Sequence, residues 1–206
     1  MNYLAHLFLA QSSVESQVGN LLGDFARGIR PDQLPSAVRR GLFNHRLVDR
    51  FTDQHPQVRE LKSLISQPRR RFAGIMLDMV FDHYLIKHWH CYSERSFSDS
   101  CRDYYANLQR GRALMPLPMQ QVTRRITEQD WFSSYAEIEG IGYALDRVAT
   151  RIRFPHQFAG AVIELRQHEE AIEQGFLRFF PQLCAAVDDA ALERHPVDEP
   201  GSPAQG

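Results

Sequence analysis

The sequence has few cysteines and almost no lysine, and each shortage narrows the class of protein. The three cysteines include no CxxC pair, so neither a disulfide framework nor a thiolate zinc site is expected. Only two of the 24 basic residues are lysine and the others are arginine, a side chain suited to bidentate contact with carboxylate or phosphate. The same bias also fits the coding composition of a source genome, so it indicates no function by itself.

Long apolar runs and internal repeats are missing as well. The first ten residues are apolar, but the run is short, lacks a positive leader and contains His6. It therefore predicts neither a signal peptide nor a membrane span. We expect a cytoplasmic protein that binds neither a membrane nor a nucleic acid.

The sequence also lacks the pattern of β-strands, since no long segment alternates polar and apolar residues. The 43% of hydrophobic residues suffice for one core, and residues 1–192 are predicted to form a single all-α domain. Residues 193–206, rich in proline and glycine, have the composition of a disordered tail. Helices are predicted from Ser36 through Phe51 and over 69–92, 98–113, 119–131, 135–153 and 155–180, the last ending at Pro181.

Several carboxylates fall inside runs that otherwise read as buried helix. Asp24 lies in one apolar run, and Asp78 and Asp82, with His83 beside them, lie in another. An ionised aspartate in apolar surroundings is costly unless a cation or hydrogen-bond donors compensate it. Asp24 could instead cap a following helix, although little helix is expected to follow it.

A third polar group lies between these two runs. His45, Asp49 and Asp53 are spaced four residues apart and so share one helical face. Such a face can hold one cation or one water molecule. It could equally be a solvated stripe, because Arg46 and Arg50 lie beside it and exposed helices commonly alternate charges.

Together these side chains offer oxygen and imidazole ligands without a thiolate pair. That set suits Mn²⁺, Mg²⁺ or Fe²⁺ better than structural zinc. A divalent ion activates water and neutralises charge on phosphoryl oxygens, which phosphoester hydrolysis requires. His6, alone in an apolar run, could add a ligand or could be a hydrogen-bonded core residue.

Four motifs in this order also resemble one known family. They are Asn2-Tyr3-Leu4-Ala5-His6, Gly19-Asn20-Leu21-Leu22-Gly23-Asp24-Phe25, His45-Arg46-x-x-Asp49-x-x-Thr52-Asp53-x-His55-Pro56 and Asp78-x-x-x-Asp82-His83-x-Leu85. The chain resembles the acyl carrier protein phosphodiesterases from residue 2 to about residue 180. The resemblance implies an all-α, HD-domain-like helical bundle. It also implies a cytoplasmic Mn²⁺-dependent hydrolase of lipid metabolism, which removes 4'-phosphopantetheine from the serine of holo acyl carrier protein.

The HD pattern suggests which residues bind the metal. By position His6 matches its first histidine, Asp24 the aspartate of its His-Asp pair, and Asp78 or Asp82 its last aspartate. Gly23 stands where the histidine of the pair is expected, so His83, His45 or Asp53 could supply the missing ligand. We accordingly expect metal ligands among His6, Asp24, Asp78, Asp82 and His83. The expected catalytic residues are Asp24, His45 and Asp49, with His45 or Asp49 managing the proton of the serine leaving group.

Charge is distributed unevenly, which bears on the partner. Residues 1–71 hold 11 basic against 6 acidic side chains, and residues 154–206 hold 3 against 9. The resemblance implies a strongly acidic partner, and opposite charges speed such encounters. The predicted partner-binding residues are Arg39, Arg40, Arg46, Arg50 and Asp53, with Arg69-Arg70-Arg71 nearby. Two alternatives stay open: a hydrolase of nucleotides or cyclic dinucleotides, and a helical binding module without catalysis.

Overall fold

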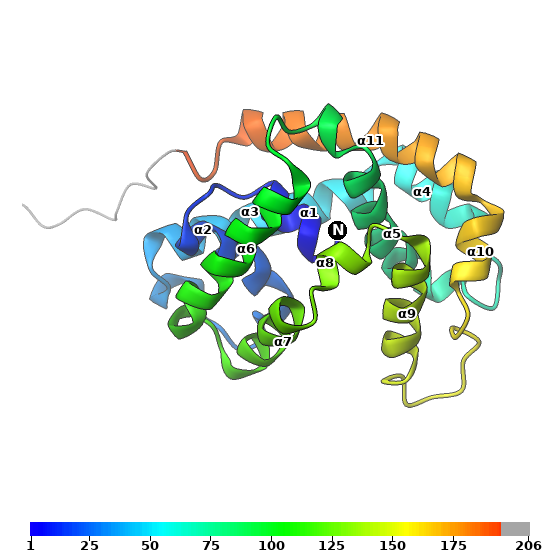
Figure 1. Cartoon of the computed structure of the whole chain (residues 1–206), viewed down its shortest axis with the longest axis horizontal. Helices are drawn as coiled ribbons and strands as arrows, with labels where there is room; N and C mark the ends of the chain where they lie inside the picture. The colour runs from blue at the N-terminus through cyan, green and yellow to red at the C-terminus, as the bar shows by residue number, and fades with distance from the viewer. Residues whose placement is uncertain (195–206) are drawn as a thin grey trace, which may run out of the picture.

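The computed structural model describes residues 1–194, which fold into helices joined by turns and short loops (Figure 1). The α-helices are α1 (Tyr3–Phe8), α2 (Val14–Leu22), α3 (Ser36–Gln54), α4 (Pro56–Leu64), α5 (Ala73–Lys87), α6 (Phe97–Arg110), α7 (Leu117–Glu128), α8 (Trp131–Ser134), α9 (Ile138–Ala149), α10 (Val162–Gln167) and α11 (Glu169–Ala190). None of the described residues lies in a strand. The predicted all-α class is therefore confirmed, whereas the likeness to HD domains stays a prediction.

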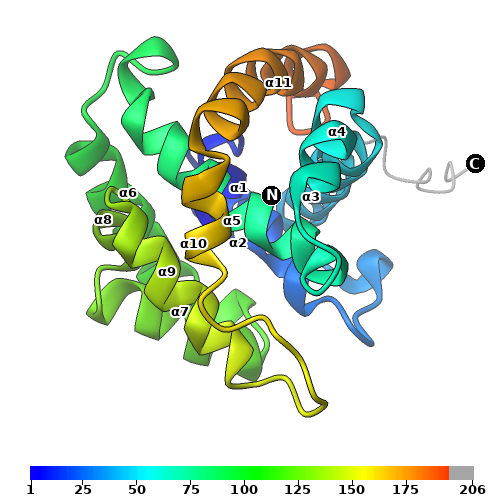
Figure 2. The same ribbon diagram turned by 90° about the vertical axis from the view of Figure 1, so that its right-hand side faces the viewer.

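Helix α1 lies in the middle of the molecule, with other helices around it (Figures 1 and 2). Six residues are too few for a stable helix in water, so α1 depends on its surroundings. Leu4, Ala5, His6 and Leu7 are all buried. This packing brings a histidine into the interior beside α3 and α5.

Helices α2 and α3 pack closely because each has a glycine where they meet. A Cβ atom on Gly41 would lie 2.6 Å from the carbonyl oxygen of Ser16 and 2.9 Å from Cα of Gly19. Both neighbours are backbone atoms, which cannot move away independently of their helix. The glycine pair therefore sets the depth at which α3 meets α2.

Substituting Gly41 with alanine is expected to destabilise the fold. Forcing an extra carbon into a packed contact typically costs about 1–3 kcal/mol, and we expect the midpoint of urea unfolding, followed by circular dichroism, to fall accordingly. Gly74→Ala is the matched control, because its Cβ would meet only Lys62 Cε at 3.8 Å. Equal midpoints for the two variants would show that the helices adjust freely.

The prediction of one helix over 155–180 is wrong in two respects. Residues 155–161 are not helical, and the remainder divides into α10 and α11. Helix α11 then continues through Pro181 to Ala190, although an interior proline removes one hydrogen bond and usually breaks a helix. Phe180 and Leu183, on either side of Pro181, are fully buried. Apolar packing on both sides of the proline thus offsets its local cost.

The predicted helix over 69–92 is α-helical only from Ala73 to Lys87, with 3₁₀ turns at Arg70–Phe72 and Trp89–Cys91. Within residues 1–194, no helix combines the length and the apolar character needed to cross a membrane. Most of the predicted tail, residues 195–206, lies outside the described residues. Glu193 and Arg194 form a turn after α11.

Candidate metal centre

His45 and Asp49 lie one turn apart on α3, and their side chains meet. Nε2 of His45 is 3.0 Å from Oδ2 of Asp49, and Nδ1 of the same ring is 2.7 Å from the backbone oxygen of Asn20. A carbonyl can only accept, so Nδ1 carries a proton. Metal-binding histidines are commonly oriented by this kind of bond. Nε2 therefore faces Asp49, to which it donates a hydrogen bond when the ring is charged, and it is the nitrogen left to bind a metal when the ring is neutral.

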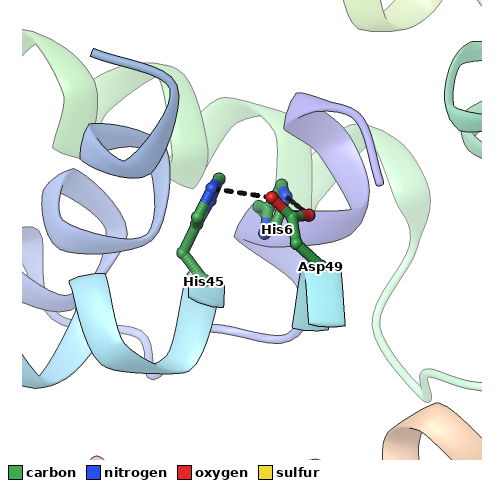
Figure 3. A group of neighbouring side chains, drawn as sticks. All are labelled: His6, His45 and Asp49. Atoms are coloured by element: carbon green, nitrogen blue, oxygen red, sulfur yellow. Dashed lines mark ion pairs between the residues drawn. The ribbon is translucent and has the colours of Figure 1, made fainter. Parts of the chain in front are cut away.

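His6 reaches the same carboxylate from α1. Its Nε2 is 3.2 Å from Oδ1 of Asp49, and its ring stacks on that of His45, with centroids 4.1 Å apart (Figure 3). The ring is fully buried, and neither nitrogen has a hydrogen-bond partner of good geometry among the described residues. An unsatisfied buried polar atom costs free energy. A cation at Nε2 of His6 would remove that cost.

These three side chains form a group suited to one cation. One ligand atom from each of His6, His45 and Asp49 lies within 4.8 Å of the other two. Across residues 1–194, no other set of histidine, cysteine, aspartate and glutamate side chains is grouped as closely. His45 is only 4% exposed, so at this end the α3 face is not a solvated stripe. Two imidazole nitrogens and a carboxylate oxygen fit a Mn²⁺ or Fe²⁺ ion.

Gly23 explains how His45 reaches this position. A Cβ atom built on Gly23 would overlap the imidazole of His45, with Cδ2, Nε2 and Cγ as its nearest atoms. The backbone of Gly23 is in the right-handed helical region, so the glycine is needed for space rather than for conformation. The His45 ring therefore occupies the space where a side chain at position 23, the expected place of the HD histidine, would begin.

The amino group of Met1 lies between two further carboxylate oxygens. Its nitrogen is 3.2 Å from Oδ1 of Asp49 and 3.1 Å from Oδ1 of Asp78. The positive charges of Met1 and His45 also act on Asp24, as does the negative charge of Asp49. Asp24, Asp49 and Asp78 thus form an acidic region beside the histidines, and a cation already lies within it.

The charges of this region shift one another's pKa values. Burial alone would raise the pKa of Asp49, but the ring of His45, followed by the ring of His6 and the amino group of Met1, reverses the effect and lowers it. Burial lowers the pKa of His6 to about 3. The pKa of His45 is raised, because Asp49 outweighs the effect of burial. Burial raises the pKa of Asp24. Asp49 therefore stays ionised and His6 stays neutral, as metal ligands must be, whereas a protonated His45 has to release a proton before it can bind an ion.

Asp82, a predicted metal ligand, forms hydrogen bonds with the N-terminal end of α1. Its carboxylate accepts hydrogen bonds from Nδ2 of Asn2 at 2.8 Å and from the backbone N–H groups of Leu4 and Ala5 at 3.1 and 3.0 Å. A carboxylate at a helix N-terminus satisfies unpaired donors and complements the helix dipole. Asp82 therefore caps α1 from α5 and positions the helix that carries His6.

Two other predicted residues also lie outside the three-residue group. Nδ1 of His83 is 2.9 Å from the backbone oxygen of Tyr135. Asp53 is exposed and its Oδ1 accepts a hydrogen bond from Nζ of Lys62 at 2.8 Å. Of the three predicted replacements for the missing histidine, His45 is the one that the structure brings beside His6.

The predicted docking arginines lie along α3, and two of them, Arg46 and Arg50, directly follow His45 and Asp49 in the sequence. Arg46 and Arg50 are exposed, and Arg39 and Arg40 are half-buried. None of the four forms an ion pair with a carboxylate of the described chain. Their charges are therefore free for an acidic partner.

Asn20 is a supporting residue that sequence reasoning missed. Besides its backbone bond with His45, its Oδ1 accepts from Nδ2 of Asn44 at 2.9 Å, and its Nδ2 donates to Oε1 of Glu193 at 2.6 Å. Glu193 also accepts from Ser16 Oγ at 2.6 Å. In the sequence, Asn20 could have been recognised as a polar residue within the apolar run between Gly19 and Gly23. Its partner Glu193 could not be recognised, because it is 173 residues away in the sequence.

A cavity of about 390 Å³ opens beside the acidic region. Met1, Asp24 and Asp78 line one side of it, and residues of α7, α8 and α9 line the other. Asp24 is exposed and Asp78 is half-buried, and both carboxylates are accessible from the cavity. A small molecule in this cavity would contact both carboxylates.

Comparison with known proteins gives one consistent result. A family model described as "Acyl carrier protein phosphodiesterase" matches residues 1–183. A protein of that name from Serratia proteamaculans (strain 568) is 35% identical over 193 residues, covering 93% of this chain and 100% of its own. Proteins of the same name from Yersinia enterocolitica and Salmonella agona are 32% and 33% identical, again over 93% of this chain and their full lengths. No solved structure matches the chain.

Proposed function

The chain belongs to the acyl carrier protein phosphodiesterase family, whose members are phosphodiester hydrolases, and from this premise we propose its reaction. The enzyme hydrolyses the phosphodiester between 4'-phosphopantetheine and the serine of holo acyl carrier protein. The products are apo acyl carrier protein and free 4'-phosphopantetheine. The observation that supports a hydrolytic centre is the group formed by buried His6 and His45 with half-buried Asp49, close to an accessible cavity.

The proposed cofactor is Mn²⁺, with Mg²⁺ or Fe²⁺ as substitutes. His6, His45 and Asp49 would hold the ion, and Asp78 lies close enough to Asp49 to share the same cationic partner. When bound, such an ion neutralises charge developing on the phosphoryl oxygens and favours ionisation of water. The unpartnered nitrogens of His6 support this assignment, because the structure otherwise leaves them unsatisfied.

Asp24 is the proposed proton-handling residue. Asp24 is exposed at the cavity that its carboxylate lines, and the protein around the carboxylate raises its pKa by desolvation, so it holds a proton to higher pH than a free aspartate. A serine alkoxide is a poor leaving group, and a positioned acid typically contributes about 100- to 10,000-fold in rate. Asp24 can donate that proton to the serine oxygen. His45 and Asp49 are instead engaged with each other.

The proposed partner surface is the exposed basic part of α3. Arg46 and Arg50 lie on the helix that also carries His45 and Asp49. An acidic carrier protein on this surface would bring its modified serine toward the cavity. Such complementarity acts mainly on the rate of encounter and on salt sensitivity.

Charge reversal tests this surface. The double variant Arg46→Glu/Arg50→Glu is expected to raise KM for the carrier protein more than about ten-fold, because like charges oppose docking, while kcat for a small phosphodiester stays unchanged. Steady-state kinetics at two salt concentrations measures both effects. The control is Arg124→Glu/Arg125→Glu on α7, which also reverses two adjacent arginines. If the α3 variant and 0.5 M salt both left KM unchanged, the electrostatic surface would be elsewhere.

The reaction is tested most directly by mass. Purified enzyme is incubated with holo acyl carrier protein, with Mn²⁺ in one sample and chelator in another, and the carrier is weighed by mass spectrometry. We expect loss of the phosphopantetheine mass with Mn²⁺ alone. Holo carrier intact in both samples would reject the proposed reaction. Turnover of cyclic dinucleotides with an intact carrier would instead favour the nucleotide alternative.

A further inference from the structure

The cavity beside the metal centre is more apolar than a phosphodiester requires. Its far wall comes from α7, α8 and α9, which lie well away from α3 in the view of Figure 2. The apolar lining residues of this wall are Val122, Trp131, Tyr135, Ala144 and Val148. Ligand cavities of about 300–1,000 Å³ with apolar walls and few polar groups are typical for organic molecules. A phosphate alone would use none of this wall.

Two arginines, Arg147 in α9 and Arg151 just after its end, give the same wall a positive charge. Arg147 and Arg151 both line the cavity, and neither pairs with a carboxylate in the described part of the chain. Arg151 lines the same cavity as Asp24 and Asp78. Arginine is suited to bidentate contact with phosphate.

Arg147, in contrast to Arg151, has side-chain partners among the described residues. Its guanidinium lies 4.9 Å from the ring centroid of Trp131 and donates to Oε1 of Gln129 at 3.2 Å. This stacking fixes one face of the indole against the cation. The cavity lining therefore combines the carboxylates of Asp24 and Asp78, an arginine that is free of side-chain partners within residues 1–194 and an aromatic and aliphatic wall.

We propose that this cavity binds the 4'-phosphopantetheine arm, with Arg151 at its phosphate and the α7–α9 wall along its pantetheine chain. The inference rests on the proposed function, since it assigns a place to part of that substrate. The arm is anionic at one end and mostly uncharged beyond it, which matches a lining that combines charged groups with an apolar wall. Its serine-linked end would face the metal centre, and the carrier protein would stay outside.

Two roles are thereby divided between α3 and α9. Both views place the amino terminus of the chain between these helices (Figures 1 and 2). Arg46 and Arg50 of α3 would contact the carrier, and Arg151, just after α9, would contact the arm. A carrier without the arm should then bind weakly, and the free arm should bind on its own.

Binding of free 4'-phosphopantetheine, measured by calorimetry with Mn²⁺ present, tests the proposal without any turnover. Ala144→Trp places an indole in the cavity, and Leu117→Trp, at an exposed position outside the cavity lining, is its control. Arg151→Ala removes the phosphate contact, and exposed Arg153→Ala is its control. We expect about ten-fold or greater weakening for Ala144→Trp and Arg151→Ala, the size of a lost contact with a charged group, and none for the controls.

The same variants separate this proposal from the reaction itself. In Ala144→Trp, KM for holo acyl carrier protein should rise by a larger factor than KM for bis(4-nitrophenyl) phosphate, which lacks the arm, while Leu117→Trp should change neither. Wild-type binding of the arm by both variants would overturn the cavity assignment and leave the reaction standing. Failure of the unmodified enzyme to release the arm from the carrier would instead reject the reaction. If Ala144→Trp proves misfolded by circular dichroism, Arg151→Ala decides the outcome.

Discussion

Replacing Asp49 with asparagine is expected to abolish metal-dependent hydrolysis. Asp49 is the one carboxylate that contacts both histidines, through Oδ2 to His45 and Oδ1 to His6, so the substitution removes the negative charge that both share. Loss of an outer-shell partner of a metal ligand alone costs about 10- to 100-fold. Loss of this central carboxylate should therefore lower kcat/KM by more than about 100-fold. Mn²⁺ titration by calorimetry should show correspondingly weaker binding.

The control for Asp49→Asn is Asp188→Asn. Asp188 is an exposed carboxylate on α11 whose Oδ1 pairs with Arg194 at 2.6 Å, so its loss removes a surface ion pair worth little. It should leave Mn²⁺ binding and turnover unchanged. Retention of Mn²⁺ affinity by Asp49→Asn would show that the ion binds elsewhere, with Asp24 and Asp78 as the next carboxylates to test.

Replacing Gly23 with alanine is expected to have an effect of similar size. The added methyl group would occupy the space of the His45 imidazole, so the ring must leave its place beside Asp49. Hydrolysis and Mn²⁺ binding should both fall more than about 100-fold, since displacing a ligand exceeds the effect of an outer-shell loss. The backbone of Gly23 is compatible with alanine, and the methyl group meets a side chain rather than backbone atoms. The variant should therefore still fold, as checked by its thermal unfolding midpoint, while its activity is lost.

Gly74→Ala controls for the glycine substitution itself, because its Cβ would make only ordinary contacts. A stricter test moves the imidazole: the double variant Gly23→His/His45→Gly restores a histidine to the position that the HD pattern expects. Part of the Mn²⁺ affinity lost in His45→Gly should return. Full activity in Gly23→Ala would show that the position of the His45 ring is unimportant for the reaction.

The helical class was predictable because it depends on local patterns. Residues such as Val38, Leu42 and Val48 recur at helical spacing, and α3 begins at Ser36 as predicted from the preceding Pro35. The end of α11 was not predictable in this way. Local rules end a helix at Pro181, whereas burial of Phe180 and Leu183 carries it to Ala190. Packing energy outweighed a local preference that sequence alone can show.

The candidate site was likewise predictable from the sequence only where it depends on local spacing. Spacing alone placed His45 and Asp49 on one face of a helix, since four residues make about one turn. Sequence also showed that Asp82 needs compensation, but it did not show whether a cation or hydrogen-bond donors supply it. The structure supplies donors, from Asn2, Leu4 and Ala5. The ligand set itself stays a prediction that Mn²⁺ binding can test.

The sequence by itself thus determined the helical class and, through four motifs, the family of this protein. It also pointed to Gly23 as the position where the predicted metal pattern would be interrupted. Only the tertiary structure decided how the interruption is resolved, because the distance between Gly23 and His45 depends on how α2 packs against α3. Periodicity specifies which face of a helix a side chain occupies. The neighbour that this face meets is set by packing between segments far apart in the chain, which brings the His45 ring into the space left by a missing side chain.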